Sequence, residues 1–212
     1  MRQVLNFSFW DRHPLKIATQ LIGCELVMED AQGRVSAGYI VETEAYSADE
    51  EACHAYSRER VKHSSRVAQF FGDPGRSYIY LNYGIHKLLN IISGPKDAGG
   101  SVLIRAVEPS QGVEFMKERR GFRKNTELTN GPGKLTEALG IDLRYNDIDI
   151  CNDKSPLKIF ANSSHKKHSL LAGPRVGISK AQDLPWRFAQ KDSAYISRAK
   201  ENRDLKLMTV KD

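Results

Sequence analysis

Short stretches rich in apolar and β-branched residues recur along the chain, separated by glycine, proline and aspartate. Such stretches predict β-strands joined by turns. Near the N-terminus, strands are expected over residues 24–28 and 36–46, with a turn at 30–33. Because side chains alternate along a strand, Glu42 and Glu44 should project from the same face of the second strand.

The middle of the chain predicts a hairpin-like unit. Residues 77–90 are rich in aromatic and aliphatic side chains, with Gly84 as a bulge or bend. Residues 101–107 are expected to pair with them across the Gly/Pro-rich loop 93–100. Arg105 is the odd member of an otherwise apolar strand and should share a face with Leu103.

Helical periodicity and glycine stops predict helices at the N-terminus before Gly23 and over residues 111–120 and 134–139. Short strands are expected over residues 157–160, 175–178 and 186–189. Strands with uneven connections and no regular βαβ spacing indicate an α+β fold with a mainly antiparallel sheet. No repeat, low-complexity tract or linker divides the chain, so residues 1–212 are expected to form a single domain.

The one informative feature of the composition is an excess of basic over acidic residues. The 212 residues carry a formal net charge of +6, which suits a polyanionic partner but does not by itself require one. The three cysteines form no CxxC or zinc-like cluster, which predicts unpaired thiols in a reducing compartment and no metal site. With no signal peptide and no long apolar run, an intracellular protein without membrane contact is expected.

Glu44 and Arg105 are the first candidates for chemistry. A carboxylate beside Tyr46 on a strand end, with Arg105 on another strand, could hold a water and accept its proton, because the arginine would favour the ionised carboxylate. A solvent-facing glutamate on an edge strand is the alternative from composition alone.

Aromatic side chains are the second candidate feature, in the set Tyr46, His54, Tyr78, Tyr80 and Tyr83. Flat aromatic walls stack on nucleobases and attract cationic bases through their π faces. Ordinary packing of a Tyr-x-Tyr strand in a core accounts for the same pattern.

The sequence Gly-Pro-Gly-Lys at 131–134 lacks the spacing of a P-loop. Its backbone and Lys134 could still meet a DNA phosphate at a helix start, although a structural turn is equally compatible. The basic stretches 119–124 and 165–168 could contact a DNA backbone or form solvated loops, and the two histidines at 165 and 168 lack partners for a metal.

Several blocks together resemble the alkyladenine (3-methyladenine) DNA glycosylase family. They keep the family's order over nearly the whole chain and are 41–46 (VETEAY), 53–55 (CHA), 75–91 (GRSYIYLNYGIHKLLNI), 102–109 (VLIRAVEP), 131–141 (GPGKLTEALGI), 173–178 (GPRVGI) and 185–188 (PWRF). The resemblance implies one compact α+β domain with a curved antiparallel sheet flanked by helices. It also implies a monomeric base excision repair enzyme that acts on damaged purines in double-stranded DNA without a metal or organic cofactor.

The same resemblance assigns roles to individual residues. Glu44 matches the general base that activates water, and Arg105 the arginine that helps to hold that water. Tyr46, His54 and Tyr80 match the walls of the pocket around the extruded base. Asn90 matches the residue that crowds the 2-amino group of guanine, and Leu103 matches an apolar neighbour of the pocket. Tyr83 matches the side chain that fills the gap left in the duplex.

Residues 55–66 depart from the shorter loop of the family, which affects the expected substrate range but not the catalytic positions. No lysine occupies a matched catalytic position, so a monofunctional hydrolase that leaves an abasic site is expected. Two alternatives remain open from the sequence. One is a retaining O-glycosidase with Glu42 and Glu44 as paired carboxylates, and the other is a non-catalytic reader of damaged DNA.

Overall fold

The computed structural model describes residues 2–56, 65–162 and 169–208. Most of loop 55–66 and the basic stretch 165–168 therefore lie outside the described residues. The strands are β1 (Glu25–Glu29), β2 (Val35–Ser47), β3 (Ser77–Asn82), β4 (His86–Ser93), β5 (Gly100–Gln111), β6 (Leu157–Phe160), β7 (Leu170–Gly173), β8 (Arg187–Gln190) and β9 (Lys206–Leu207).

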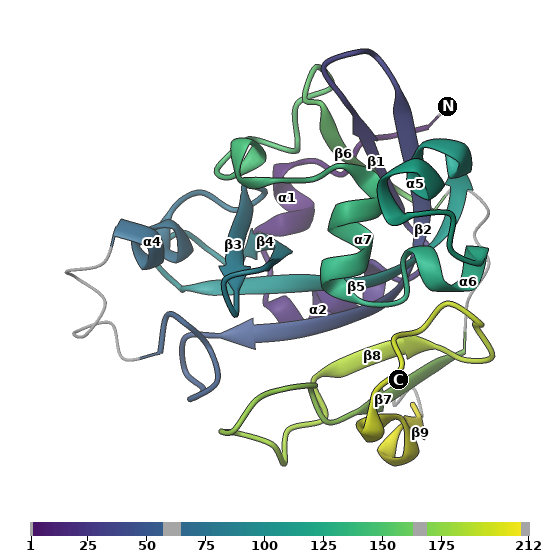
Figure 1. Ribbon diagram of the computed structural model, residues 1–212. Coiled ribbons are helices and arrows are strands. Elements are labelled where there is room, and N and C mark those ends of the chain that lie inside the picture. Colours follow the sequence, from purple (N-terminus) through teal and green to yellow (C-terminus); the bar gives the residue numbers. More distant parts are fainter. Residues whose placement is uncertain (1, 57–64, 163–168, 209–212) are drawn as a thin grey trace.

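These strands form one sheet in the order β3-β4-β5-β2-β8-β7-β9, and β1 pairs with both β2 and β6. Each ladder among the named strands is antiparallel. Figure 1 shows β3 and β4 at one side of the sheet and the β8-β7-β9 part at the foot of the view, near the C-terminus. The α+β fold with a mainly antiparallel sheet is thus confirmed.

Strand β2 is the centre of this arrangement because both of its edges are paired. One edge runs along β5, and the other meets β1 near its start and β8 over Glu42–Glu44. The two glutamates therefore lie in a central strand, and the alternative of an exposed edge-strand glutamate is wrong.

The helices are α1 (Phe7–Trp10), α2 (Pro14–Gln20), α4 (Ser65–Ala68), α5 (Val113–Arg120), α6 (Asn125–Leu128) and α7 (Pro132–Leu139), with 3-10 turns η1 (Gln69–Phe71), η2 (Leu143–Tyr145) and η3 (Lys200–Asp204). Helix α5 begins later than predicted because Gln111 still belongs to β5, and Gly112, at φ +70°, forms the turn into the helix, where a Cβ would meet the Val35 carbonyl oxygen. Among the described residues, no helix is both long enough and apolar enough to span a bilayer.

The main core lies on one face of the sheet. It joins side chains of α2 and α7 to strand residues such as Leu89, Ile91 and Ile104. The Thr43 hydroxyl donates to the backbone carbonyl of Ala18 in α2, so Thr43 points to this face. Its neighbours Glu42 and Glu44 consequently point to the opposite face, away from α2.

Gly84 marks a reverse turn and not a bulge within one strand. Asn82 and His86 are partners in the β3-β4 ladder, and the three residues between them form the tip of a hairpin. Tyr83 has φ +50° and Gly84 φ +73°, so two successive residues occupy the left-handed region. That conformation reverses the chain and costs energy at Tyr83, where the side chain carries a Cβ.

The predicted strand at 175–178 is wrong, because the strand in this part of the chain is β7, which ends at Gly173. Residues 175–178, which follow β7, contact buried glutamates instead of pairing with another strand. The Val176 N–H donates to Glu44 and the Arg175 side chain to Glu50, so this segment serves side-chain contacts in place of a ladder.

Candidate active site

Arg105 occupies an irregular position in strand β5. Glu42 lies opposite Ala106, and the next residue, Thr43, lies opposite Ile104, so Arg105 has no partner position on β2. An extra residue of this kind forms a β-bulge, which redirects a side chain. The bulge places the Arg105 guanidinium between Glu42 and Glu44.

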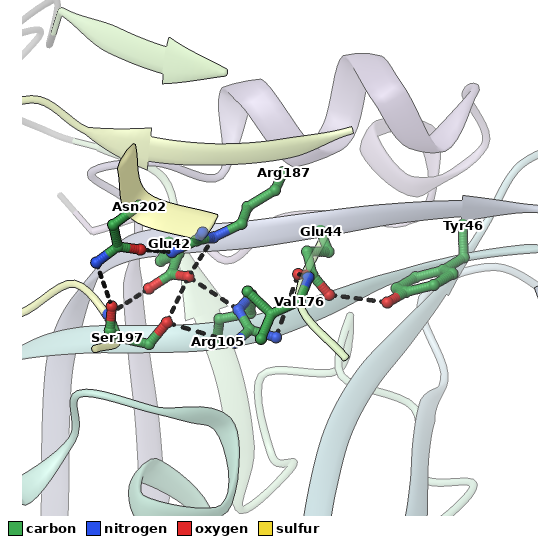
Figure 2. Close-up of polar contacts among 8 residues, drawn as sticks. All are labelled: Glu42, Glu44, Tyr46, Arg105, Val176, Arg187, Ser197 and Asn202. Atoms are coloured by element: carbon green, nitrogen blue, oxygen red, sulfur yellow. Dashed lines mark hydrogen bonds and ion pairs between the residues drawn. The ribbon is translucent and has the colours of Figure 1, made fainter. Parts of the chain in front are cut away.

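Glu44 is fully buried, and its carboxylate has three donors among the described residues. Oε1 accepts from the Val176 N–H at 2.7 Å and lies 3.2 Å from Nη1 of Arg105. Oε2 accepts from the Tyr46 hydroxyl at 2.8 Å. Figure 2 shows Glu44 between these groups, with Tyr46 on one side and Arg105 and Val176 on the other.

Tyr46 acts as a donor because it keeps its proton. Burial and the adjacent Glu44 carboxylate raise the pKa of Tyr46 well above its usual value. The hydroxyl therefore stays protonated at physiological pH and can donate to Glu44 throughout.

Glu42 is also fully buried, and its carboxylate accepts from four described donors, one more than that of Glu44. Oε1 accepts from Nε of Arg105, Nε of Arg187 and the Ser197 hydroxyl, each at 2.8 Å. Oε2 accepts from the Ser197 N–H at 2.5 Å. Burial would raise the pKa of Glu42, but the two arginines and the Ser197 hydrogen bonds outweigh burial and lower it.

A cavity of about 450 Å³ opens beside this network. Tyr46, Arg105 and Val176, the three partners of Glu44, all line it, whereas neither glutamate does. The cavity volume falls in the range of roughly 300–1,000 Å³ that is typical of small-ligand pockets. Glu44 thus lies directly behind the part of the wall that its own partners form.

One row of cross-strand partners connects the cavity wall to the carboxylates. Tyr78 lies opposite Asn90, Asn90 opposite Leu103, Leu103 opposite Glu44, and Glu44 opposite Arg187. Directly opposed residues project from the same face of a sheet. Five strands therefore direct one residue each to the same side, and the first three of these residues line the cavity.

Aromatic rings form another part of the wall. The ring centroids of His54 and Tyr80 are 4.8 Å apart, and those of Tyr78 and Tyr80 5.5 Å apart. Nδ1 of His54 lies 3.2 Å from the hydroxyl of Tyr78. Burial, followed by the charge of Glu44, raises the pKa of Tyr80 to about 12.

Tyr83 is the most exposed large apolar or aromatic side chain in the described part of the chain, at 82%. It belongs to the cavity lining and sits at the tip of the β3-β4 hairpin. Lys134 is not in the lining, although Pro132 of the same turn is. The Lys134 ammonium donates to Oδ1 of Asn130, and desolvation together with nearby Arg120 and Arg198 lowers its pKa.

The structure brings together all the site residues expected from the sequence except Lys134, which lies outside the cavity. Sequence reasoning missed further members: Phe70 in the lining, Ser197 and Arg187 on Glu42, and Arg175, whose guanidinium lies 4.6 Å from the Tyr46 ring centroid. Arg175 also forms two hydrogen bonds to the Glu50 carboxylate, at 2.6 and 2.9 Å. Arg175 and Arg187 are charged residues within apolar blocks, which was the signal that could have identified them.

Comparison with known proteins gives one consistent result. The model of the methylpurine-DNA glycosylase (MPG) family matches residues 8–194. A Bacillus subtilis protein is 41% identical over 198 residues, which cover 92% of this chain and 96% of that protein. A Chlorobium phaeobacteroides protein is 40% identical over 200 residues (94% and 98%), and a Salinibacter ruber protein is 38% identical over 201 (92% and 97%).

All three relatives bear the name "Putative 3-methyladenine DNA glycosylase". The family match covers most of the chain and includes both glutamates, Arg105 and the aromatic wall. The resemblance carried by the sequence blocks is therefore confirmed, and the chain belongs to the methylpurine-DNA glycosylase family.

Proposed function

We propose that this protein is a monofunctional glycosylase that removes alkylated or deaminated purines from double-stranded DNA and leaves an abasic site. The observation that carries the proposal is the Glu44 carboxylate, which is held by Arg105, Val176 and Tyr46 directly behind an aromatic cavity. The relatives' names, which specify 3-methyladenine, support the substrate class.

In this proposal, the Glu44 carboxylate accepts a proton from a water that attacks the anomeric carbon of the extruded nucleotide. Cleavage of an N-glycosidic bond passes through an oxocarbenium-like sugar, and a nearby anion stabilises that positive charge. Arg105 holds the Glu44 carboxylate in a fixed place. Water is the nucleophile, so the products are the free base and an abasic sugar.

Glu42 does not fit the alternative of a paired-carboxylate glycosidase. Its carboxylate accepts from four donors, does not line the cavity and has a lowered pKa, so it is neither free to attack a sugar nor protonated to act as an acid. Its role in the proposal is to hold Arg105.

The aromatic wall is suited to purines that carry a positive charge. Rings of Tyr46, His54 and Tyr80 offer π faces, which attract alkylated, cationic bases more than neutral ones. A cationic base is also a good leaving group and needs no strong general acid. Asn90, between Tyr78 and Leu103 in the row of cross-strand partners, would crowd the 2-amino group of a normal guanine, and Leu103 would contact the base edge.

Tyr83 is placed to occupy the gap that the extruded base leaves. Extrusion costs a few kcal/mol, and stacking of an inserted ring on the neighbouring bases offsets part of that cost. The positively charged groups around Lys134 would hold the DNA backbone, since Arg120, Arg123 and Arg198 are close enough to affect its pKa.

Lysine-based strand cleavage is not part of the proposal. Among the described cavity residues the only lysine is Lys180, which is 66% exposed and forms a 3.5 Å ion pair with Glu51. Borohydride should trap no DNA adduct with the protein, and a clean covalent band would contradict a monofunctional mechanism.

The decisive experiment uses two duplex oligonucleotides, one with a single hypoxanthine and one treated with a methylating agent. Wild type, Glu44→Gln and the matched surface variant Glu114→Gln are incubated with each, and hot alkali then cleaves the DNA at abasic sites. We expect cleavage with wild type and Glu114→Gln on at least one duplex and none with Glu44→Gln. Tight binding without cleavage by the wild type would contradict the proposal and support a non-catalytic reader.

A further inference from the structure

The segment between β8 and β9 reaches back across the sheet to the carboxylates of β2. Ser197 contacts Glu42 twice, through its backbone N–H at 2.5 Å and its hydroxyl at 2.8 Å. The same hydroxyl accepts from Nη2 of Arg105 at 3.3 Å. Ser197 is 4% exposed and does not line the cavity, so its contacts are with the network and not with a substrate.

Ser197 is itself held by a closed ring of hydrogen bonds. Nδ2 of Asn202 donates to the Ser197 carbonyl at 2.9 Å, and Oδ1 of Asn202 accepts from Nη2 of Arg187 at 2.6 Å. Arg187 in turn donates to Glu42, which completes the ring. Figure 2 shows these four residues grouped at one end of the network, with Arg105 between them and Glu44.

The ring fixes the plane of the Arg105 guanidinium. Its Nε is bound by Glu42 and its Nη2 by Ser197, so its remaining nitrogen, Nη1, is directed to Glu44. A guanidinium is planar, and two anchored nitrogens determine where the third lies. The position of Nη1 relative to the Glu44 carboxylate therefore depends on a serine that lies far from both in the sequence.

We infer that Ser197 is a positioning residue for catalysis, which acts through Glu42 and Arg105 to align the Glu44 carboxylate. This inference rests on the proposed function, because it assigns Ser197 to the same Glu44 reaction. Loss of the hydroxyl leaves Nη2 of Arg105 without that acceptor and Glu42 with one donor fewer, so the guanidinium can turn away from Glu44. Hydrogen bonds to charged groups are strong enough that we expect the rate of the chemical step to fall by about 10- to 100-fold.

The test compares Ser197→Ala, Ser197→Thr and the control Ser193→Ala under single-turnover conditions, with enzyme in saturating excess over the damaged duplex. Ser193 belongs to the same segment, but within the described part of the chain its hydroxyl accepts only from the Tyr195 N–H, in a local turn. Thr restores the hydroxyl at position 197. Titration with a duplex that carries a non-cleavable abasic analogue gives the active fraction of each preparation and its affinity.

We expect a lower rate constant for Ser197→Ala, with an unchanged affinity and active fraction, near-wild-type values for Ser193→Ala, and at least partial recovery in Ser197→Thr. A merely structural role would lower the active fraction and leave the rate constant of the remaining enzyme unchanged, and this outcome would overturn the inference. A Ser197→Ala rate constant within about threefold of wild type would overturn it as well. An inactive wild type would instead refute the proposed function, so the two failures are distinguishable.

Discussion

Replacement of Glu42 by glutamine should destabilise the protein much more than its small change in shape suggests. The Glu42 carboxylate accepts from Arg105, Arg187 and two groups of Ser197 within the protein interior. Glutamine keeps one acceptor oxygen, but the other oxygen is replaced by an NH2 group, which can only donate and so faces other donors. Two arginines would then share one neutral amide in place of a buried negative charge.

The size of this destabilisation depends on which partners Arg105 and Arg187 keep in the variant. Removal of one partner of a buried ion pair costs about 3–5 kcal/mol. Arg105 keeps Glu44 and Arg187 keeps Asn202, so the lower end of this range, about 3 kcal/mol, is expected. For a domain of this size, that loss corresponds to a melting temperature lower by about 6–12 °C.

Urea denaturation of wild type, Glu42→Gln and the surface control Glu114→Gln measures the effect, with unchanged m-values as the sign of an intact unfolding transition. The pKa of Glu42 is lowered in the folded state, so its contribution is present above its unfolded pKa and is lost as pH falls through the folded value. The difference between wild type and variant should therefore be full near neutrality and shrink in acid. A Glu42→Gln protein within about 1 kcal/mol of wild type at neutral pH would refute the reasoning, as would a difference that grows in acid.

Other predictions concern protons, thiols and DNA. Burial raises the pKa of Tyr80 to about 12, so this side chain should ionise late in an alkaline absorbance titration, and Tyr80→Phe should remove that late component. The variant should also lose less stability than wild type as pH rises from 10 to 12. An unchanged titration curve would contradict this prediction. Burial likewise raises the thiol pKa of Cys24 to about 11 and those of Cys53 and Cys151 to about 12. Near neutral pH, iodoacetamide should therefore alkylate all three thiols far more slowly in the folded protein than in urea. Equal alkylation rates in the two conditions would contradict this prediction. Lys134→Ala should weaken binding to all duplexes alike and reduce the slope of log affinity against log salt by about 1, whereas an unchanged slope would remove Lys134 from the DNA interface.

Local patterns were sufficient to predict much of the fold. Alternation along 36–46 gave β2 nearly to its ends, and the glycines at 121 and 140 marked the ends of α5 and α7. Both features depend on residues that are close in the chain, where side-chain direction and backbone freedom are set locally.

What could not be predicted depends on contacts between distant residues. The bulge at Arg105 follows from the register of β5 against β2, which no local pattern specifies. Residues 175–178 have a strand-like composition, but the Val176 N–H is used by Glu44, 132 residues away in the chain. Ser197 carries no signal at all, since a single serine in a polar segment is ordinary until its hydroxyl is seen on Glu42.

The two glutamates of β2 show why residue type and strand face are not enough to assign a role. Both are fully buried, point to the same side and contact the same arginine. A carboxylate has about four acceptor sites, and Glu42 uses four donors, whereas the described partners of Glu44 supply three. Among the described residues, the Oε2 atom of Glu44 accepts only from the Tyr46 hydroxyl, so it has room for one more hydrogen bond, from a water. Three of the four described donors to Glu42 belong to Arg187 and Ser197, which do not line the cavity. All three described partners of Glu44 do line it, so of the two carboxylates Glu44 is the one held at the cavity wall.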